Sequence, residues 1–131
     1  MTRYPTVGEI VAFHRLLMLD EGQPQASLLS VEKLEGAVAR PSATGFGEEM
    51  FPSLAEKAAT LLQAIVVAHP FLDGNKRAGL AGMLLLLRLN GVSAEADEDA
   101  LYDLVIAVTT GALREVPEIA GRIRQLFALP E

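Results

Sequence analysis

Nine residues between two strongly apolar stretches carry most of the side chains that could do chemistry. They read His-Pro-Phe-Leu-Asp-Gly-Asn-Lys-Arg over residues 69–77. The last two, Lys76 and Arg77, fall in the first turn of a predicted helix, where unpaired N–H groups already carry about half a positive charge. Each cation there is expected to lower the stability of the helix by on the order of 0.3–1 kcal/mol. Cations, free N–H groups and a glycine at one helix start describe a site for an anion that the chain does not itself supply. A phosphate would fit it.

Two more side chains of this segment could act on a bound phosphate. Histidine is the side-chain type whose unperturbed pKa lies near neutrality, so His69 is the natural candidate to take a proton from a hydroxyl. Asp73 offers the hard oxygen ligands that Mg²⁺ prefers. The alternative is purely structural, because Asp73-Gly74 can form a tight turn and Pro70 can end the preceding helix.

Composition narrows the range of ligands. The 131 residues include no cysteine, so a thiol nucleophile and a disulfide frame are excluded. A formal net charge of −6 disfavours direct binding of nucleic acid. The longest apolar run, residues 78–87, is half of the roughly twenty residues that a membrane helix needs, and no secretory signal is visible. We expect a cytoplasmic protein without a membrane partner.

The elements that must position this segment are predicted to be helices. Alternating runs typical of strands hardly occur, while capping boxes at Thr6 to Glu9 and Ser53 to Glu56 mark helix starts. We predict an all-α domain over residues 1–131, in which an apolar fourth helix is buried and the others pack around it. The predicted helices cover residues 6–20 (stopping near Gly22 and Pro24), 28–39, 53–69, 75–89, 97–110 and 117–127.

The segment 69–77 resembles the signature of the Fic/Doc family, His-x-Phe-x-(Asp/Glu/Asn)-(Gly/Ala)-Asn-(Gly/Lys)-Arg, in its Doc (death-on-curing) branch. Stretches from EIVAFHRLL at residues 9–17 to LYDLVIAVTTGAL at residues 101–113 are similar to compact Doc proteins. The resemblance implies a helical bundle of about six helices around the helix that follows the motif. It also implies that His69 deprotonates a target hydroxyl, that Asp73 binds Mg²⁺ and that Phe71 packs the loop into the core. The residues expected to hold ATP are Gly74, Asn75, Lys76 and Arg77, of which Lys76 and Arg77 are also expected to act in catalysis.

Two positions bear on which phosphate of ATP is attacked. Fic proteins that transfer AMP have glycine where this chain has Lys76, and a second arginine where it has Leu80. Lys76 adds bulk and charge near the phosphates, and Leu80 removes a phosphate contact. In the Doc branch this change accompanies transfer of the γ-phosphate to a Ser/Thr hydroxyl. The resemblance therefore implies a protein kinase, with AMP transfer or a catalytically silent anion-binding module as alternatives.

The resemblance also implies partners. Doc proteins are toxins of toxin–antitoxin pairs that inhibit translation. The implied target is a threonine of translation elongation factor Tu, and the implied inhibitor is a small Phd-like antitoxin encoded beside the toxin.

The segment 40–52 is too long and too rich in Gly and Pro for a simple helix connection. The family has a flap here that offers a backbone edge to the target. We expect an extended, target-binding piece that pairs with an added strand and positions a hydroxyl for His69, although a packed loop is the alternative. The flap residues are Thr44, Gly45, Phe46 and Gly47.

Other polar residues have structural explanations. His14 lies on the apolar side of the first predicted helix, so we expect a core histidine that is hydrogen-bonded to a neighbour and could brace the site. Glu35 is expected to be solvated, because Val31 lacks the hydroxyl that a self-inhibitory motif of the family requires. The acids at residues 95–99 favour a helix start over a metal site. Thr109 and Thr110 close a helix and need no functional interpretation.

Overall fold

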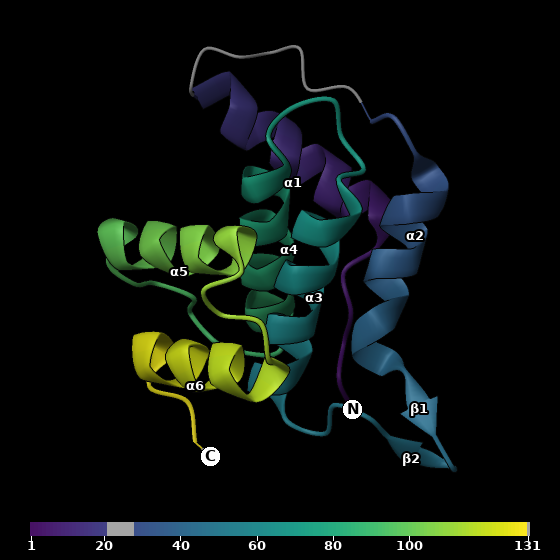
Figure 1. Ribbon diagram of the computed structural model, residues 1–131, viewed down its shortest axis with the longest axis vertical. Coiled ribbons are helices and arrows are strands. Elements are labelled where there is room, and N and C mark those ends of the chain that lie inside the picture. The colour runs from purple at the N-terminus through teal and green to yellow at the C-terminus, as the bar shows by residue number, and fades with distance from the viewer. Residues whose placement is uncertain (21–27, 131) are drawn as a thin grey trace.

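The computed structural model describes residues 1–20 and 28–130, and this part of the chain is mostly helical (Figure 1). A 3₁₀ turn, η1 (Arg40–Ser42), and a hairpin of β1 (Thr44–Gly45) and β2 (Glu48–Glu49) separate the second helix from the third. The predicted all-α class is confirmed, while the predicted helix stop near residues 22–24 lies outside the described residues. The helices are α1 (Val7–Asp20), α2 (Val31–Ala39), α3 (Leu54–Ala68), α4 (Asn75–Leu89), α5 (Glu98–Thr110) and α6 (Val116–Phe127).

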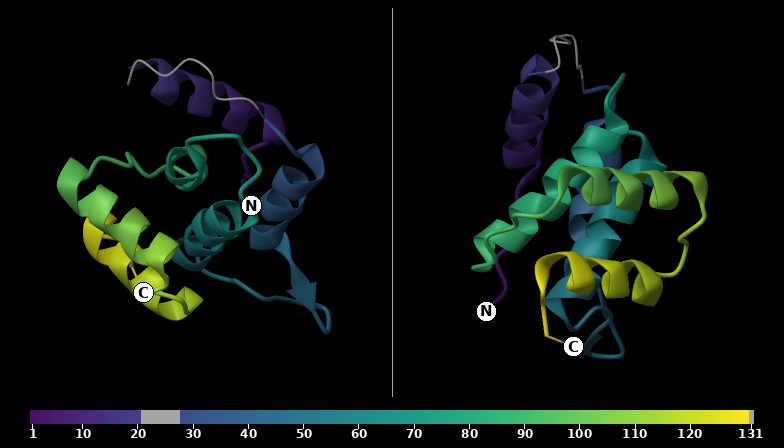
Figure 2. Two further views of the ribbon diagram at one scale, coloured as in Figure 1. Left: turned by 45° about the horizontal axis from the view of Figure 1, so that its top comes forward. Right: turned by 90° about the vertical axis from the view of Figure 1, so that its left-hand side faces the viewer.

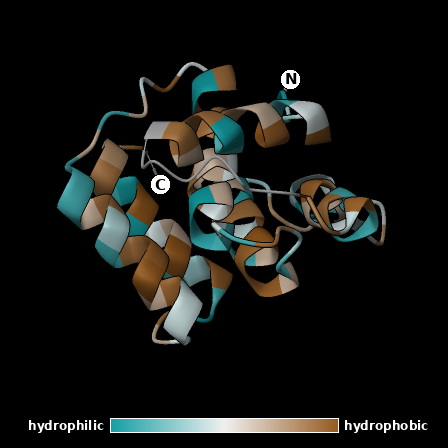
Figure 3. Cartoon of the chain, turned by 90° about the horizontal axis from the view of Figure 1, so that it is seen from above, coloured by the Kyte–Doolittle hydropathy of each residue, from teal (hydrophilic) through white to brown (hydrophobic). Residues whose placement is uncertain are grey.

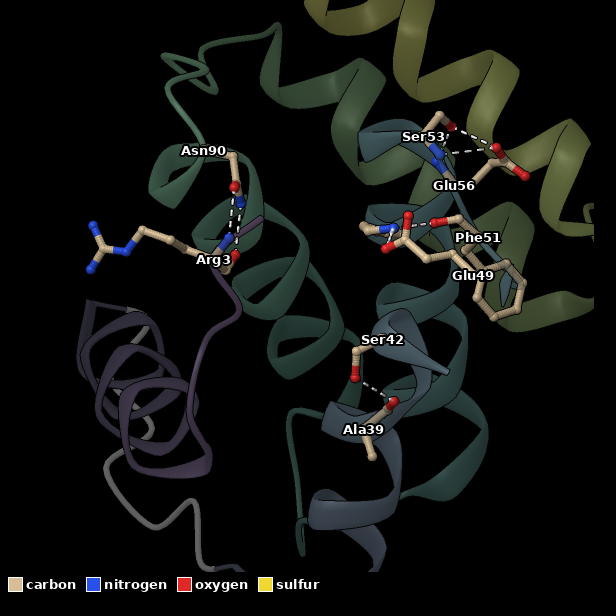
Figure 4. Close-up of polar contacts among 9 residues, drawn as sticks. Arg3, Ala39, Ser42, Glu49, Phe51, Ser53, Glu56 and Asn90 are labelled. Atoms are coloured by element: carbon tan, nitrogen blue, oxygen red, sulfur yellow. Dashed lines mark hydrogen bonds and ion pairs between the residues drawn. The ribbon is translucent and has the colours of Figure 1, made fainter. Parts of the chain in front are cut away.

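Side-chain caps set the helix starts that the sequence predicted. The Thr6 hydroxyl accepts a hydrogen bond from the Glu9 N–H at 3.1 Å, and the Glu9 carboxylate accepts one from the Thr6 N–H at 2.9 Å. Ser53 and Glu56 form the same reciprocal pair at the start of α3 (Figure 4). Both capping boxes are therefore confirmed.

The second helix begins later than predicted. The Ser30 hydroxyl caps it by accepting from the Lys33 N–H at 3.2 Å, so α2 starts at Val31 and not near Leu28. The N–H groups of residues 29 and 30 donate to the Pro70 carbonyl, at 2.8 and 3.1 Å. This long-range pairing holds the segment before α2 against the 69–77 loop, which helix propensity alone does not reveal.

The centre of the core is a pair of helices. α3 contacts α2, α4, α5 and α6, while α4 contacts α1, α3 and α5 (Figure 2). A side chain at Gly79 of α4 would begin 2.8 Å from Val66, and one at Gly82 would begin 2.8 Å from Ile65. These two glycines let α4 approach α3 closely. The predicted buried fourth helix thus shares the centre with α3, and the outer helices carry mixed hydrophilic and hydrophobic surfaces (Figure 3).

The predicted flap is a two-stranded hairpin. Thr44 pairs with Glu49 and Gly45 with Glu48, around a turn in which Phe46 and Gly47 both have positive φ, 54° and 81°. Two such residues make the turn typical of tight hairpins. The predicted extended piece is therefore present, but its partner is β2 of the same chain.

The hairpin is fastened to the N-terminal end of α3. The Lys57 ammonium, only 1% exposed, lies 3.0 Å from a Glu49 carboxylate oxygen and donates to the Phe51 carbonyl (Figure 4). Residues 69–74 follow the opposite end of α3 (Figure 1). The 15 residues of α3 span about 22 Å. α3 therefore lies between the hairpin and His69 (Figure 1).

Phe46→Pro is expected to open this hairpin. Proline fixes φ near −65°, which is incompatible with the positive φ of Phe46, and such strain costs on the order of 1–3 kcal/mol. Amide hydrogen exchange at Met50, whose N–H donates to the Ala43 carbonyl at 3.0 Å, should become faster. The matched control is Phe46→Gly, which tolerates positive φ and removes only a fully exposed ring. Unchanged protection of Met50 in the proline variant would contradict this description of the turn.

None of the helices in the described ranges is long and apolar enough to cross a membrane.

Candidate active site

A cleft of about 520 Å³ opens at the N-terminal end of α4. Four elements surround it: α1, the end of α3, the loop before α4, and α5. It brings together every residue for which the motif predicted a catalytic or ATP-binding role. The lining residues are Met18, Val66, His69, Leu72, Asp73, Gly74, Asn75, Lys76, Arg77, Tyr102 and Thr109.

His69 is oriented by its own backbone and by α3. It is the C-cap of α3 in the left-handed conformation, with φ 52°, and its N–H donates to the Ile65 carbonyl at 3.2 Å. Its ring Nδ1 lies 2.8 Å from the Val66 carbonyl. A carbonyl can only accept, so Nδ1 carries the proton and Nε2 is left with a lone pair. The exposed ring can therefore take a proton through Nε2.

The side-chain amide of Asn75 is hydrogen-bonded to the backbone of the loop that precedes α4. Its amide oxygen accepts from the Phe71 N–H at 2.9 Å, and its amide nitrogen donates to the Phe71 carbonyl at 2.9 Å. The side chain is only 9% exposed. The resemblance implied contact with phosphate, but in the structure the amide group binds the loop backbone. What Asn75 can offer an anion is its backbone N–H in the first turn of α4.

Gly74 is required at the junction of loop and helix. Its φ is 72°, and a side chain there would begin 2.5 Å from Met18 Sδ and 2.7 Å from His14 Nε2. A glycine N-cap has no side chain to bond the first N–H groups of α4. The first-turn residues Asn75, Lys76 and Arg77 line the cleft, so it combines a helix N-terminus with two cationic side chains, which is the arrangement that anion sites use.

His14 braces the loop from α1, as the sequence predicted. Its ring is completely buried and stacks on Phe71, with centroids 4.0 Å apart. Its Nε2–H donates to the Gly74 carbonyl at 3.0 Å, and the buried Nδ1 has no partner among the described residues. Burial lowers the pKa of His14 below 6.5, against the smaller opposing effects of hydrogen bonds to the Gly74 and Asp73 backbone and of the Asp73 charge.

The free energy of unfolding is expected to decrease as the pH falls, because of His14. The folded chain holds this ring neutral, whereas the unfolded chain binds its proton near pH 6.5, so the unfolded state takes up more protons below that pH. The stabilising contribution is complete above pH 6.5 and is lost as the pH falls toward the lowered pKa. We expect the melting temperature to drop between pH 7.5 and 5, and to drop less in His14→Gln, which keeps an amide donor but does not titrate. Equal slopes in both proteins would contradict this role.

α5 supplies two cleft residues that the sequence reasoning missed. The Arg77 guanidinium carbon lies 5.9 Å from the centre of the Tyr102 ring, a cation–π contact. Thr109, interpreted from sequence only as a helix end, lines the same cleft, and its hydroxyl donates to the Val105 carbonyl at 2.8 Å. Tyr102 and Thr109 are seven positions apart, which puts them on one face of the helix. This seven-residue spacing is visible in the sequence. Without tertiary contacts, however, it does not indicate whether that face of α5 packs toward the motif.

Among the described residues that line the cleft, Asp73 is the one that offers a carboxylate to a metal ion. One oxygen of Asp73 accepts from the Gly74 N–H at 2.8 Å. Within residues 1–20 and 28–130, no three His, Cys, Asp or Glu side chains are grouped as a metal centre. Mg²⁺ in phosphate sites is commonly held by one or two carboxylates together with substrate phosphates. The residues therefore fit an ion that arrives with a nucleotide.

Comparison with known proteins places this geometry in a family. The model of the Fic/DOC family matches residues 4–87. "Toxin Doc" of Mycolicibacterium smegmatis is 44% identical over 79 residues, which is 59% of this chain and 61% of that protein. "Protein kinase doc" of Escherichia phage P1 is 36% identical over 99 residues, or 76% of each chain. The chain belongs to the Fic/DOC family, with a motif of the Doc type.

Proposed function

We propose that this protein is a Doc-type toxin that transfers the γ-phosphate of ATP to a Ser or Thr hydroxyl of a protein. The observation that carries the proposal is the juxtaposition, in one cleft, of an imidazole with a free Nε2 lone pair and a cation-lined helix start. The names of the two relatives, a toxin and a protein kinase, support it.

In the proposed reaction, His69 Nε2 takes the proton of the target hydroxyl as the hydroxyl oxygen bonds to the γ-phosphorus. The bond between that phosphorus and the oxygen bridging to the β-phosphate breaks, and ADP leaves with the bond electrons. The imidazolium then returns its proton to solvent. Proton removal at the moment of attack contributes typically 10²–10⁴ in rate.

The start of α4 would balance the charge of the phosphates. Lys76, Arg77 and the first N–H groups of the helix together present positive charge to one end of the cleft. Mg²⁺, when bound through Asp73 and the phosphates, would neutralise further charge on them. Phosphoryl transfer depends mainly on positioning and charge neutralisation, so this set of residues is sufficient.

The experiment for this proposal is intact-mass analysis of an acceptor protein. The proposed acceptor is translation elongation factor Tu, incubated with the purified protein, ATP and Mg²⁺. We expect the mass of one phosphoryl group on a threonine, and suppression by a small Phd-like antitoxin. Addition of AMP would establish the adenylyltransferase alternative. An unmodified acceptor, with ATP binding intact, would favour a silent nucleotide-binding module or another target.

Lys76→Gly is expected to lower γ-phosphate transfer about tenfold and to raise the share of AMP transfer. The exposed Lys76 side chain lines the cleft, so its removal takes away charge and opens space beside the phosphates. Rates with ATP labelled at either the α- or the γ-phosphate measure both activities. Lys76→Arg, which keeps charge and bulk, is the matched control. Unchanged γ-phosphate transfer in the glycine variant would contradict a role of this side chain in orienting the nucleotide.

The hairpin at residues 44–49 remains a proposed contact for the protein target. A target segment paired with the hairpin would have to run the length of α3 to reach His69, which takes about seven extended residues. If the target uses this path, Phe46→Pro lowers target modification and leaves ATP binding unchanged. Full modification of the target by that variant would mean that the target docks elsewhere.

A further inference from the structure

Two exposed leucines accompany His69 on the outside of the molecule. Leu72, which is 62% exposed, lines the same cleft as His69. Leu29, which is 64% exposed, lies in the segment before α2 (Figure 1), and its N–H donates to the carbonyl of Pro70, the residue after His69, at 2.8 Å. The loop that follows His69 therefore displays one large apolar side chain and adjoins a second.

The pairing of these two segments sets the direction of both leucines. Leu28 and Phe71 form an isolated antiparallel bridge, and both pack against the core, with Phe71 only 2% exposed. Successive side chains of paired extended segments point to opposite faces. Leu29 and Leu72 therefore lie on the outward face as diagonal neighbours, a spacing that one large side chain can bridge. We call these two residues the leucine rim.

Hydrogen bonds and a buried ring hold the leucine rim in place. The Pro70 carbonyl accepts from the N–H groups of residues 29 and 30, at 2.8 and 3.1 Å. The Asn75 amide bonds both backbone groups of Phe71, at 2.9 Å each, and the buried His14 ring stacks on the Phe71 ring. A surface that is ordered before binding loses little conformational freedom when a partner covers it, so even a small contact there can add affinity.

The chemistry at His69 decides which ligand covers the leucine rim. The ring Nδ1 faces the Val66 carbonyl at 2.8 Å, so Nε2 is the nitrogen that meets the acceptor hydroxyl. The phosphates of ATP are attracted to the cations at the start of α4, and two uncharged leucines offer them nothing. Consecutive residues of an extended peptide are about 3.3 Å apart, so a peptide whose hydroxyl lies at Nε2 brings its neighbouring side chains within reach of Leu72.

We propose that the leucine rim receives an apolar side chain of the acceptor protein, one or two residues from the Ser or Thr that is phosphorylated. Covering Leu29 and Leu72 removes apolar surface from water, and the contact fixes the position of the hydroxyl at His69. This inference rests on the proposed function of the cleft. It adds the kind of sequence that an acceptor must carry, and it does not depend on the hairpin at residues 44–49.

Steady-state phosphorylation of translation elongation factor Tu, at saturating ATP and Mg²⁺, tests the leucine rim. Leu29→Gln and Leu72→Gln keep side chains of similar size and make them polar. Each is expected to raise the KM for the acceptor at least fivefold and to change kcat by less than about twofold, because the rim holds the acceptor and does not touch the reacting atoms. The ATP affinity, measured by calorimetry, should also change by less than about twofold.

The acceptor provides the second half of the test. Fragment mass spectrometry locates the phosphorylated residue, and we expect an apolar side chain one or two positions from it. Replacing that side chain by glutamine should raise KM about as much as Leu72→Gln does. The two changes together should raise KM by less than the product of their separate factors, because both remove the same contact. An acceptor with no apolar side chain at these positions would overturn the proposal, as would independent effects of the two changes.

The matched control is Leu16→Gln on the outer face of α1. Leu16 is the same residue type with a similar exposure, 60%, and it does not belong to the residues that line the cleft. The KM for the acceptor should therefore be unchanged in this variant. The melting temperature of each variant, measured without ligand, verifies that it is folded.

The outcomes separate this inference from the function on which it rests. If the unaltered protein binds ATP but transfers no phosphate to a protein, the proposed function is wrong, and the rim assignment falls with it. If transfer occurs and the rim variants keep a normal KM, only the rim assignment is overturned. It is also overturned if these variants keep a normal KM but escape inhibition by a Phd-like antitoxin, because the antitoxin then covers the rim. A lower kcat with an unchanged KM would assign the leucines to positioning His69 and overturn docking.

Discussion

His69→Ala is expected to reduce phosphoryl transfer by at least 10²–10⁴ while ATP affinity changes less than about twofold. The ring is held by the Val66 carbonyl so that Nε2 can accept a proton, and His69 is the one histidine among the described residues that line the cleft. The base acts on the target hydroxyl and does not hold the phosphates, so binding should survive. Single-turnover rates and calorimetric ATP affinity measure the two effects separately.

A second variant, His69→Asn, distinguishes loss of the catalytic base from misfolding. His69 occupies the left-handed region with φ 52°, where alanine is strained. His69→Asn tolerates this backbone conformation better and still lacks a basic nitrogen. Normal transfer by a folded asparagine or alanine variant would remove His69 from the mechanism.

Gly74→Ala is expected to destabilise the fold by about 2–4 kcal/mol and to weaken ATP binding. A left-handed backbone costs an alanine roughly 1–2 kcal/mol. The new methyl group would also meet Met18 Sδ at 2.5 Å and His14 Nε2 at 2.7 Å. Met18 can shift at the end of a flexible chain, but the buried His14 ring is fixed by its stacking on Phe71. The loop must therefore move, and the N–H groups of α4 move with it.

The control for this prediction is Gly47→Ala in the hairpin. Gly47 has a similar φ of 81°, but a side chain there would meet nothing within 4 Å. Gly47→Ala should lose only the stability that a left-handed backbone costs an alanine, and it should bind ATP normally. Urea unfolding measures both variants, and equal losses of stability at the two positions would show that packing against His14 and Met18 contributes nothing.

Local signals explain what could be predicted from the sequence. Capping boxes at Thr6 and Ser53 satisfy N–H groups within one turn, so the residues that decide those helix starts are neighbours in the chain. The motif likewise lies in one short segment whose charges conflict with the helix dipole unless an anion is present. The brace from His14 was foreseeable because a histidine on an apolar helix face needs a partner.

The features that were missed depend on contacts between distant segments. The start of α2 is displaced because the segment before it pairs with Pro70, about forty residues later. The side-chain amide of Asn75 is bonded to the Phe71 backbone, a contact that the position of Asn75 in the motif does not reveal. The position of the hairpin follows from the buried Lys57, whose partners Glu49 and Phe51 tie it to the start of α3. Such pairings fix where an element lies without leaving a periodic signal in the sequence.

In the proposed reaction this cleft transfers the terminal phosphate of ATP to a protein hydroxyl, with His69 as the base. The most direct measurement incubates the protein with Mg²⁺, translation elongation factor Tu and ATP labelled at either the α- or the γ-phosphate, with His69→Ala in parallel. Label is expected to reach the acceptor only from the γ-phosphate and only with His69 present. Label that arrives from the α-phosphate, or γ-label transferred equally well by His69→Ala, would contradict it.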